Sequence, residues 1–65
     1  MENRIKELRK QRKMTQDDLA AILGVTRQTI ISLENGRYNA SLQLAHRIAR
    51  YFDTAIEEIF IFEED

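Results

Sequence analysis

The side chains best suited to specific hydrogen bonding cluster in the stretch RQTIIS at positions 27–32. Arg27 carries five donors in a planar fork, and Gln28 offers an amide with both donors and an acceptor. Ser32 adds a hydroxyl, and Ile31 places an apolar side chain beside it. These residues predict a polar helix face that carries one exposed apolar side chain.

Catalytic chemistry has little support elsewhere in the chain. His46 is the single histidine and falls on the polar side of its expected helix, where a surface role is the simplest interpretation. The acid pairs Asp17–Asp18 and Glu57–Glu58 are adjacent in sequence, so their side chains point to different sides of a helix and cannot share a proton. The chain has no cysteine, glycine-rich phosphate loop or metal-ligand cluster. We therefore expect no enzyme activity, no metal site and no cofactor.

Charge is distributed unevenly along the chain, although the total is only −1. Residues 1–50 hold all ten lysines and arginines against five acids, which gives +5, whereas residues 51–65 hold six acids and no base, which gives −6. A basic body with an acidic end favours a polyanionic partner for the body. A solvated surface with uneven charge is the alternative explanation of the charge pattern taken alone.

Length and composition indicate one small helical domain over residues 1–65. Proline is absent and the only glycines are Gly24 and Gly36, which suits short helices joined by tight turns. The charged N-terminal stretch lacks the apolar segment of a signal peptide, and no apolar run approaches the ~18 residues of a membrane span. Together with the absence of cysteine, these features predict a cytoplasmic protein.

Apolar spacing and capping residues predict the first two helices. The first covers roughly residues 2–13 and has a narrow apolar stripe in a charged surface. Thr15 can cap the second helix, with Asp18 completing a capping box. Gly24 ends this helix, because glycine adopts the left-handed conformation at low steric cost.

A third helix is predicted over residues 27–34, with Thr26 as its cap. Ile30 and Leu33 lie three apart and face inward, and Val25 is expected to insert into the core just before the helix. The opposite face of this helix is then presented to solvent.

Ser41 can cap a fourth helix with a wide apolar stripe. That stripe is Leu44, Ala45, Ile48, Ala49 and Phe52. Thr54 with Glu57 is a second capping-box pattern, and it predicts a short fifth helix. Residues 60–65 alternate weakly and are predicted as a short strand or an extended arm. The fold class is therefore an all-α domain of five short helices.

Residues 16–35 have the form of a helix-turn-helix, because a three-residue turn containing glycine joins two short helices. Ala20 is small, as the close crossing of two such helices requires. The stretch TQDDLAAILGVTRQTIISLENGRYNASLQLAHRIARYF resembles the Cro/lambda-repressor type of DNA-binding domain, also called the xenobiotic-response-element family. The resemblance covers roughly residues 4–60. It is carried by Gln16, Leu19, Ala20, Gly24, Val25, Ile30, Leu33, Glu34, Asn35 and Gly36.

Within this family the chain is most similar to stand-alone, single-domain members such as the dimeric repressor of cytolysin operons. Ala40 departs from the pattern, since many relatives carry proline before the fourth helix. The resemblance implies a sequence-specific regulator of transcription, a repressor that binds a palindromic operator on double-stranded DNA as a homodimer. An antitoxin, or a module that acts mainly through a partner protein, is the alternative.

The resemblance implies that the third helix lies in the major groove and that Arg27, Gln28 and Ser32 read bases. Arginine can bond guanine N7 and O6 with two donors, and glutamine can pair with adenine N6 and N7 in the same way. Ile31 could contact a thymine methyl, or it could serve the core or a dimer interface.

Backbone phosphate contacts are expected at the ends of the two helices. The residues concerned are Gln16, Thr26, Asn35, Arg37 and Tyr38. Gln16 opens the second helix, whose free amides attract a phosphate, and the resemblance also places it against the first base reader. The simpler alternatives are that Thr26 and Asn35 are caps and that Tyr38 is a partly buried ring.

Glu34 is an acid in a segment expected to face DNA. The resemblance pairs it with an arginine of the first helix, and Arg9 matches that position. Because a half-buried charge pair needs both partners, we expect a structural role for Arg9 and Glu34.

The C-terminal segment 55–65 is the expected dimerisation surface. It contains four large apolar residues in a row, Ile59, Phe60, Ile61 and Phe62. One face of a helix or strand cannot bury all four in so small a core, and an exposed apolar cluster usually marks an interface. The alternative is that they cover the bottom of the core, above all Ile59. The final acids, Glu63, Glu64 and Asp65, are expected to stay in solvent.

Overall fold

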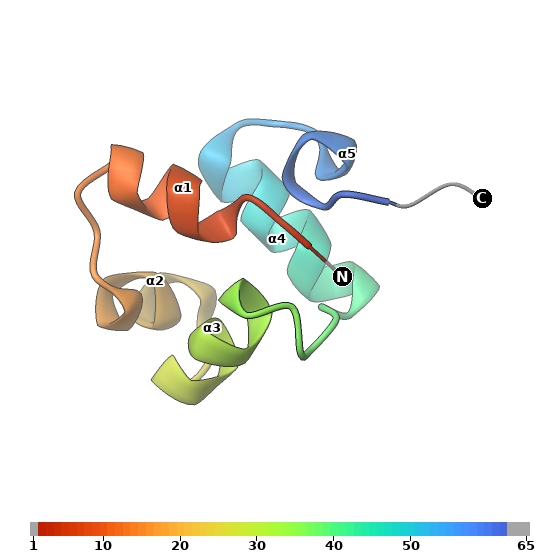
Figure 1. Ribbon diagram of the computed structural model, residues 1–65. Helices are drawn as coiled ribbons and strands as arrows, with labels where there is room; N and C mark the ends of the chain where they lie inside the picture. Colours follow the sequence, from red (N-terminus) through yellow and green to blue (C-terminus); the bar gives the residue numbers. More distant parts are fainter. Residues whose placement is uncertain (1, 63–65) are drawn as a thin grey trace.

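The structure is a computed structural model that describes residues 2–62. Its helices are α1 (Ile5–Gln11), α2 (Gln16–Leu23), α3 (Arg27–Glu34), α4 (Leu42–Phe52) and α5 (Ile56–Ile59). Figure 1 shows α2 and α3 at the bottom of the view, α1 and α4 above them, and α5 at the upper right. The predicted all-α fold and its five helices are confirmed.

Every helix contributes to one hydrophobic core. The buried apolar residues are Ile5, Leu19, Ala20, Leu23, Ile30, Leu33, Leu44, Ala45, Ile48, Ala49, Phe52, Ile59 and Phe60. All five residues of the apolar stripe predicted on the fourth helix are buried in this core. Val25 packs against the core and remains partly exposed. Burial of these side chains is the main driving force that holds five short helices together.

Three helices begin where side chains cap them. The hydroxyl of Thr15 accepts from Asp18 N and the Asp18 carboxylate accepts from Thr15 N, so the predicted capping box is present at α2. Thr26 accepts from Thr29 N at α3, and Ser41 accepts from Leu44 N at α4. These caps satisfy amides that have no partner inside the helix, which fixes where each helix starts.

The first helix is shorter than the predicted span of residues 2–13. Its start is delayed because Arg4 N donates to Ile59 O at 2.8 Å and Ile61 N donates to Glu2 O at 2.9 Å. The N-terminal residues are thus extended against the C-terminal segment, and Asn3 forms an isolated antiparallel bridge with Phe60.

The end of α1 is also earlier than predicted. Lys13 has a φ of 57° and Met14 N donates to Arg9 O at 3.1 Å, so the chain closes the helix with a left-handed residue. This is the closing geometry for which glycine is preferred, and a lysine in that position gives little local signal.

The predicted capping box at Thr54 and Glu57 is wrong. α5 is a single turn whose N-cap is Ala55, without a side-chain hydrogen bond. Thr54 N instead donates to Ala49 O at 3.0 Å, where it closes the end of α4 behind Asp53, whose φ is 54°. The residue that could have opened the fifth helix is therefore used to end the fourth.

The predicted C-terminal strand is reduced to the single bridge at Phe60 within residues 2–62. The expectation that Glu63, Glu64 and Asp65 stay in solvent lies outside the described residues. In the part of the chain that the structure describes, no helix is long and apolar enough to cross a membrane.

Candidate nucleic-acid interface

The turn between α2 and α3 sets the angle at which α3 is presented. Gly24 has a φ of 71°, and its amide donates to Ala21 O while the next amide, of Val25, donates to Ala20 O. A side chain at position 24 would be strained because L residues rarely adopt this conformation. Ala20 is only 5 % exposed, which agrees with the prediction that a small residue is needed where α2 and α3 cross closely.

The two faces of α3 differ as predicted. Ile30 and Leu33 are fully buried, whereas Arg27 and Gln28 are exposed and Ser32 is half-buried. Gln28 Nε2 donates to Ser32 Oγ at 3.4 Å across one turn of the helix. The buried face therefore fixes α3 to the core, and the other face presents the hydrogen-bonding groups of Gln28 and Ser32 close together.

A shallow hollow of about 200 Å³ lies on this exposed face. It is lined by Thr26, Gln28, Thr29, Ser32 and Tyr38. The hollow brings together two proposed base readers and two proposed phosphate contacts. Thr29 was not singled out from the sequence. It lies three residues from both Thr26 and Ser32, and that helical spacing is the signal that could have found it.

Arg9 and Glu34 form a buried ion pair that joins α1 to α3. Arg9 Nε and Nη2 donate to the two carboxylate oxygens of Glu34 at 2.7 and 3.1 Å. The side chains are only 9 % and 3 % exposed. Hydrogen bonding to Glu34, opposed by burial, raises the pKa of Arg9 above its ordinary value. The predicted ion pair is therefore confirmed, and it neutralises an acid beneath the exposed face of α3.

Gln16 completes this network. Its Nε2 donates to Glu34 Oε1 at 3.2 Å, and Arg9 Nη1 donates to Met14 O at 2.8 Å. Gln16 is half-buried at the start of α2, so its side chain is oriented by the buried pair.

A second hollow, of about 530 Å³, lies where the starts of α2 and α3 approach each other. Gln16, Asp17 and Arg27 are among its lining residues. Arg27 Nε lies 3.9 Å from Asp17 Oδ1, and both side chains are largely exposed. Asp17 is a neighbour of Arg27, the first proposed base reader, that sequence reasoning missed because the two residues belong to different helices.

The remaining proposed phosphate contacts lie at the ends of α3. Thr26 and Asn35 are the N-cap and C-cap residues, as their simpler interpretation required, and both remain exposed to solvent. Arg37 and Tyr38 follow the helix and are exposed. Ile31 is half-buried and is not among the residues that form or cover the core.

The C-terminal apolar residues do not form one exposed cluster. Ile59 and Phe60 are 0 % and 5 % exposed and belong to the core, so they offer little surface to a partner. Ile61 and Phe62 are 44 % and 56 % exposed, and Leu42 at the start of α4 is 81 % exposed. The bridge to Asn3 turns Phe60 inward, which the sequence pattern alone does not reveal.

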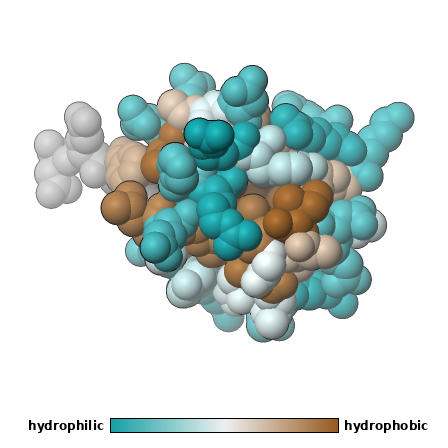
Figure 2. Space-filling model, turned by 180° about the vertical axis from the view of Figure 1, so that it is seen from behind, coloured by the Kyte–Doolittle hydropathy of each residue, from teal (hydrophilic) through white to brown (hydrophobic). Residues whose placement is uncertain are grey.

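An apolar groove of about 270 Å³ lies between two of these exposed residues, Leu42 and Phe62. It is lined by Asn39, Ala40, Leu42, Ala45, Ile56, Phe60 and Phe62. Figure 2 shows apolar patches among polar surface on the face opposite to that of Figure 1, one of them next to the grey atoms at the left.

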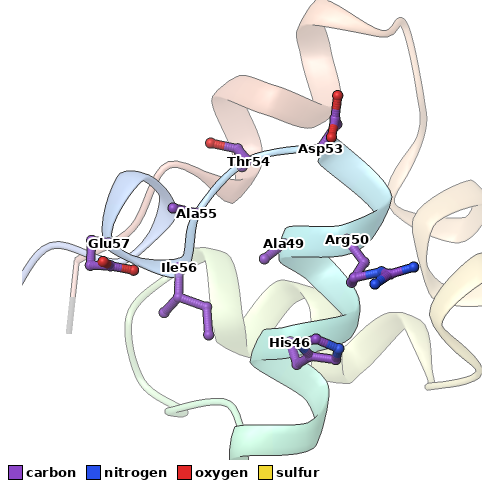
Figure 3. Close-up of a pocket in the computed structure, with 8 residues that line it drawn as sticks. All are labelled: His46, Ala49, Arg50, Asp53, Thr54, Ala55, Ile56 and Glu57. Carbon is purple, nitrogen blue, oxygen red and sulfur yellow. The ribbon is translucent and has the colours of Figure 1, made fainter.

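A further hollow, of about 460 Å³, is lined by residues of α4, of α5 and of the connection between them. Figure 3 shows that His46 and Arg50 lie one turn apart on α4 and point to the same side, while Glu57 lies across the hollow on α5. His46 is exposed, as expected. Among residues 2–62, no group of three or more histidines, cysteines or acids is arranged to hold a metal ion.

The chain is similar in sequence and in structure to known helix-turn-helix proteins. A helix-turn-helix family profile, HTH_3, matches residues 5–59. An uncharacterized HTH-type transcriptional regulator of Archaeoglobus fulgidus is 55 % identical over 65 residues, which span 100 % of this chain and 92 % of that protein. A second, from Methanocaldococcus jannaschii, is 52 % identical over 65 residues and covers 100 % and 98 % of the two chains.

A solved structure is also similar over most of its length. The restriction-modification controller protein C.AhdI from Aeromonas hydrophila superposes with a TM-score of 0.77 at 32 % identity. The match covers 88 % of this chain and 86 % of that protein.

Proposed function

The chain belongs to the helix-turn-helix family of transcriptional regulators, and from this premise we propose that it binds a palindromic operator as a homodimer and represses transcription. It is a regulator with a helix-turn-helix DNA-binding domain and not an enzyme. One observation carries the proposal: α3 is fixed by a buried face and presents Arg27 and Gln28 to solvent at its first turn.

Base reading is assigned to the exposed side chains of α3. Arg27 would bind guanine N7 and O6 with two donors, and Gln28 would bind adenine N6 and N7. Ser32 lies within hydrogen-bonding reach of Gln28, so the hydroxyl can hold the amide in position for a base or contact a base itself. Ile31 lies outside the core and is assigned to contact with a thymine methyl.

Phosphate binding is assigned to the groups around α3. Gln16 and Thr26 stand at the starts of α2 and α3, where free amides favour an anion. Asn35, Arg37 and Tyr38 are exposed at the other end of α3 and would hold the adjoining backbone. The net charge of +5 over residues 1–50 supports attraction to DNA, and the six acids of residues 51–65 all come after α4 in the sequence.

Selection of bound duplexes from random DNA tests this assignment. A palindromic motif with half-sites about 34 Å apart, one turn of the double helix, supports a two-fold dimer on an operator. Binding is expected to weaken steeply with salt, with a logarithmic slope of about −0.9 for each phosphate neutralised. A flat salt response would argue instead for the antitoxin or protein-interaction function.

Arg27→Ala tests the leading base contact. It is expected to cost about 1–3 kcal/mol and to relax selectivity at one base position. Arg50→Ala, which removes the same charge from the exposed side of α4, is the matched control and is expected to change affinity little. Equal weakening on selected and scrambled duplexes would make Arg27 a phosphate contact.

The homodimer is assigned to the apolar groove and the exposed residues beside it. Leu42, Ile61 and Phe62 are the exposed apolar side chains in this region, and Ile59 and Phe60 lie beneath them in the core. An exposed apolar patch with a groove is typical of an interaction site. In a two-fold dimer the same patch is covered on both copies, so one surface serves both partners.

Phe62→Glu tests this surface. The charge would have to be buried in the interface, so the molecular mass in light scattering is expected to fall from that of a dimer toward that of a monomer. Ile22→Glu is the matched control, because Ile22 is 45 % exposed on α2 and lies outside the groove. An unchanged mass for Phe62→Glu would remove this surface from the interface.

Repression would follow from occupancy of an operator that overlaps a promoter. A cytoplasmic location, where such an operator is accessible, belongs to the same proposal.

A further inference from the structure

Three acids lie in the helix-turn-helix, and two of them have a structural partner. Asp18 accepts from Thr15 N in the capping box, and Glu34 is neutralised by the buried Arg9. Asp17 differs from both. Its side chain is 76 % exposed, and its carboxylate oxygen Oδ1 lies 3.9 Å from Nε of Arg27. The acid thus contacts the first proposed base reader across the turn.

Asp17 also lies where a DNA backbone is expected to approach. It lines the hollow of about 530 Å³ together with Gln16 and Arg27, two residues assigned to DNA contact. A carboxylate in this position repels phosphate. An acid in the first turn of a helix does stabilise that helix through its dipole, by about 0.3–1 kcal/mol. That effect is also available from Asp18 in the same turn and does not require contact with Arg27.

Asp17 contacts the Nε side of the Arg27 guanidinium, which affects the partners that this group can bind. The carboxylate lies next to Nε, so the two terminal nitrogens of the guanidinium remain free to donate. Two parallel donors are what guanine N7 and O6 require. A phosphate competing for the same guanidinium would meet the repulsion of the nearby carboxylate. Asp17 therefore favours a base over a phosphate as the partner of Arg27.

We propose that Asp17 is a positioning residue that raises the discrimination of this protein between its own DNA site and other DNA, by holding Arg27 toward bases and opposing its contact with phosphates. This inference rests on the proposed function, because it needs Arg27 to read a base.

Asp17→Asn tests the inference in the full chain. The probes are a duplex selected from random DNA by the wild-type protein and a scrambled duplex of the same length and composition, both followed by fluorescence anisotropy. The ratio of the two dissociation constants is expected to fall about two- to five-fold, the range of an exposed ion pair. Most of the change is expected as tighter binding to the scrambled duplex.

Asp53→Asn is the matched control. It makes the same chemical change at an exposed position with a φ of 54°, which asparagine tolerates. Figure 1 shows the α4–α5 connection at the top of the molecule, opposite α3. The ratio for this variant is expected to equal that of the wild type. Asp17→Ser repeats the test with a second neutral residue suited to a first helical turn, and thermal unfolding confirms that each variant is folded.

A double-mutant cycle separates positioning from plain repulsion. In an Arg27→Ala background, Asp17→Asn is expected to leave the ratio unchanged, because the residue through which Asp17 acts is absent. A ratio that still falls in that background, or one that does not change in the wild-type background, overturns the inference while leaving the proposed function intact. Failure of the wild-type protein to select any DNA would instead remove the proposed function and this inference together.

Discussion

The middle of the molecule and its two ends are held in different ways. α2, α3 and α4 each begin at a hydroxyl side chain that accepts from an amide three residues later, so their starts depend on neighbours in sequence. α1 and α5 begin without a side-chain cap from the N-cap residue. Their segments are held by backbone hydrogen bonds between residues 2–4 and 59–61, and by the bridge of Asn3 to Phe60.

This difference matches the division of labour in the proposed function. Two of the locally capped helices, α2 and α3, carry or adjoin the groups that we assign to DNA contact, and α3 in particular has a fixed start and a buried face. The paired ends shape the side of the molecule that carries the groove proposed for a second copy. The Arg9–Glu34 pair connects the two regions, because it joins α1 to α3.

The largest expected effect comes from breaking that connection. Glu34→Ala would leave Arg9, whose side chain is 9 % exposed, without its carboxylate partner. Removing one partner of a buried ion pair costs about 3–5 kcal/mol of unfolding free energy, a large fraction of the stability of a small domain. Urea denaturation followed by circular dichroism measures the loss.

Glu7→Ala is the control for Glu34→Ala. Glu7 is paired with Arg4, but the two side chains are 54 % and 44 % exposed. Exposed pairs contribute about 0–1 kcal/mol, so this variant is expected to remain close to the wild type. Equal losses of unfolding free energy in the two variants would mean that the buried pair stabilises the fold no more than the exposed pair does. That result would contradict its role in holding α1 against α3.

The locally held elements are also the ones that the sequence predicted well. Thr15, Thr26 and Ser41 are caps in the structure because a hydroxyl before an apolar periodic segment needs only its own helix to act. The Arg9–Glu34 pair spans 25 residues of sequence, and its prediction depended on the family resemblance rather than on a local pattern.

Predictions failed where a contact outside the residue's own predicted helix decides the outcome. Thr54 has the residue type of a cap, yet its amide is engaged by the end of α4. Phe60 is a large apolar residue of the kind found at interfaces, and it was predicted there. Its bridge to Asn3 instead places it in the core. At the candidate site, the contact of Asp17 with Arg27 was missed for the same reason, since the turn at Gly24 brings together residues of two helices.

An intermediate effect is expected from loosening the ends. Asn3 Nδ2 donates to Leu33 O at 2.7 Å, and its Oδ1 accepts from Ile5 N at 3.1 Å. Asn3→Ala removes both bonds from a half-buried position, at a cost of about 1–3 kcal/mol by the usual range for a hydrogen bond. Denaturant midpoints measure this loss.

Gln43→Ala is the control for Asn3→Ala. Gln43 is an exposed amide on α4 outside the groove, so its replacement is expected to change stability by less than about 0.5 kcal/mol. The comparison between ends and middle would be wrong if Asn3→Ala had no larger effect than this control.

The smallest expected effect tests a local cap through its pH dependence. Hydrogen bonds from the backbone and side chain of Thr15 lower the pKa of Asp18 below its ordinary value of 3.8. Because the folded pKa is the lower one, the ionised Asp18 stabilises the folded state above pH 3.8, and this contribution disappears as the pH falls through the folded pKa. Asp18→Asn removes the charge but keeps the shape. The melting temperature of the wild type is therefore expected to exceed that of the variant at neutral pH. The difference between the two melting temperatures is expected to narrow in acid. A difference that stays constant with pH would show that the Asp18 charge does not contribute to the start of α2.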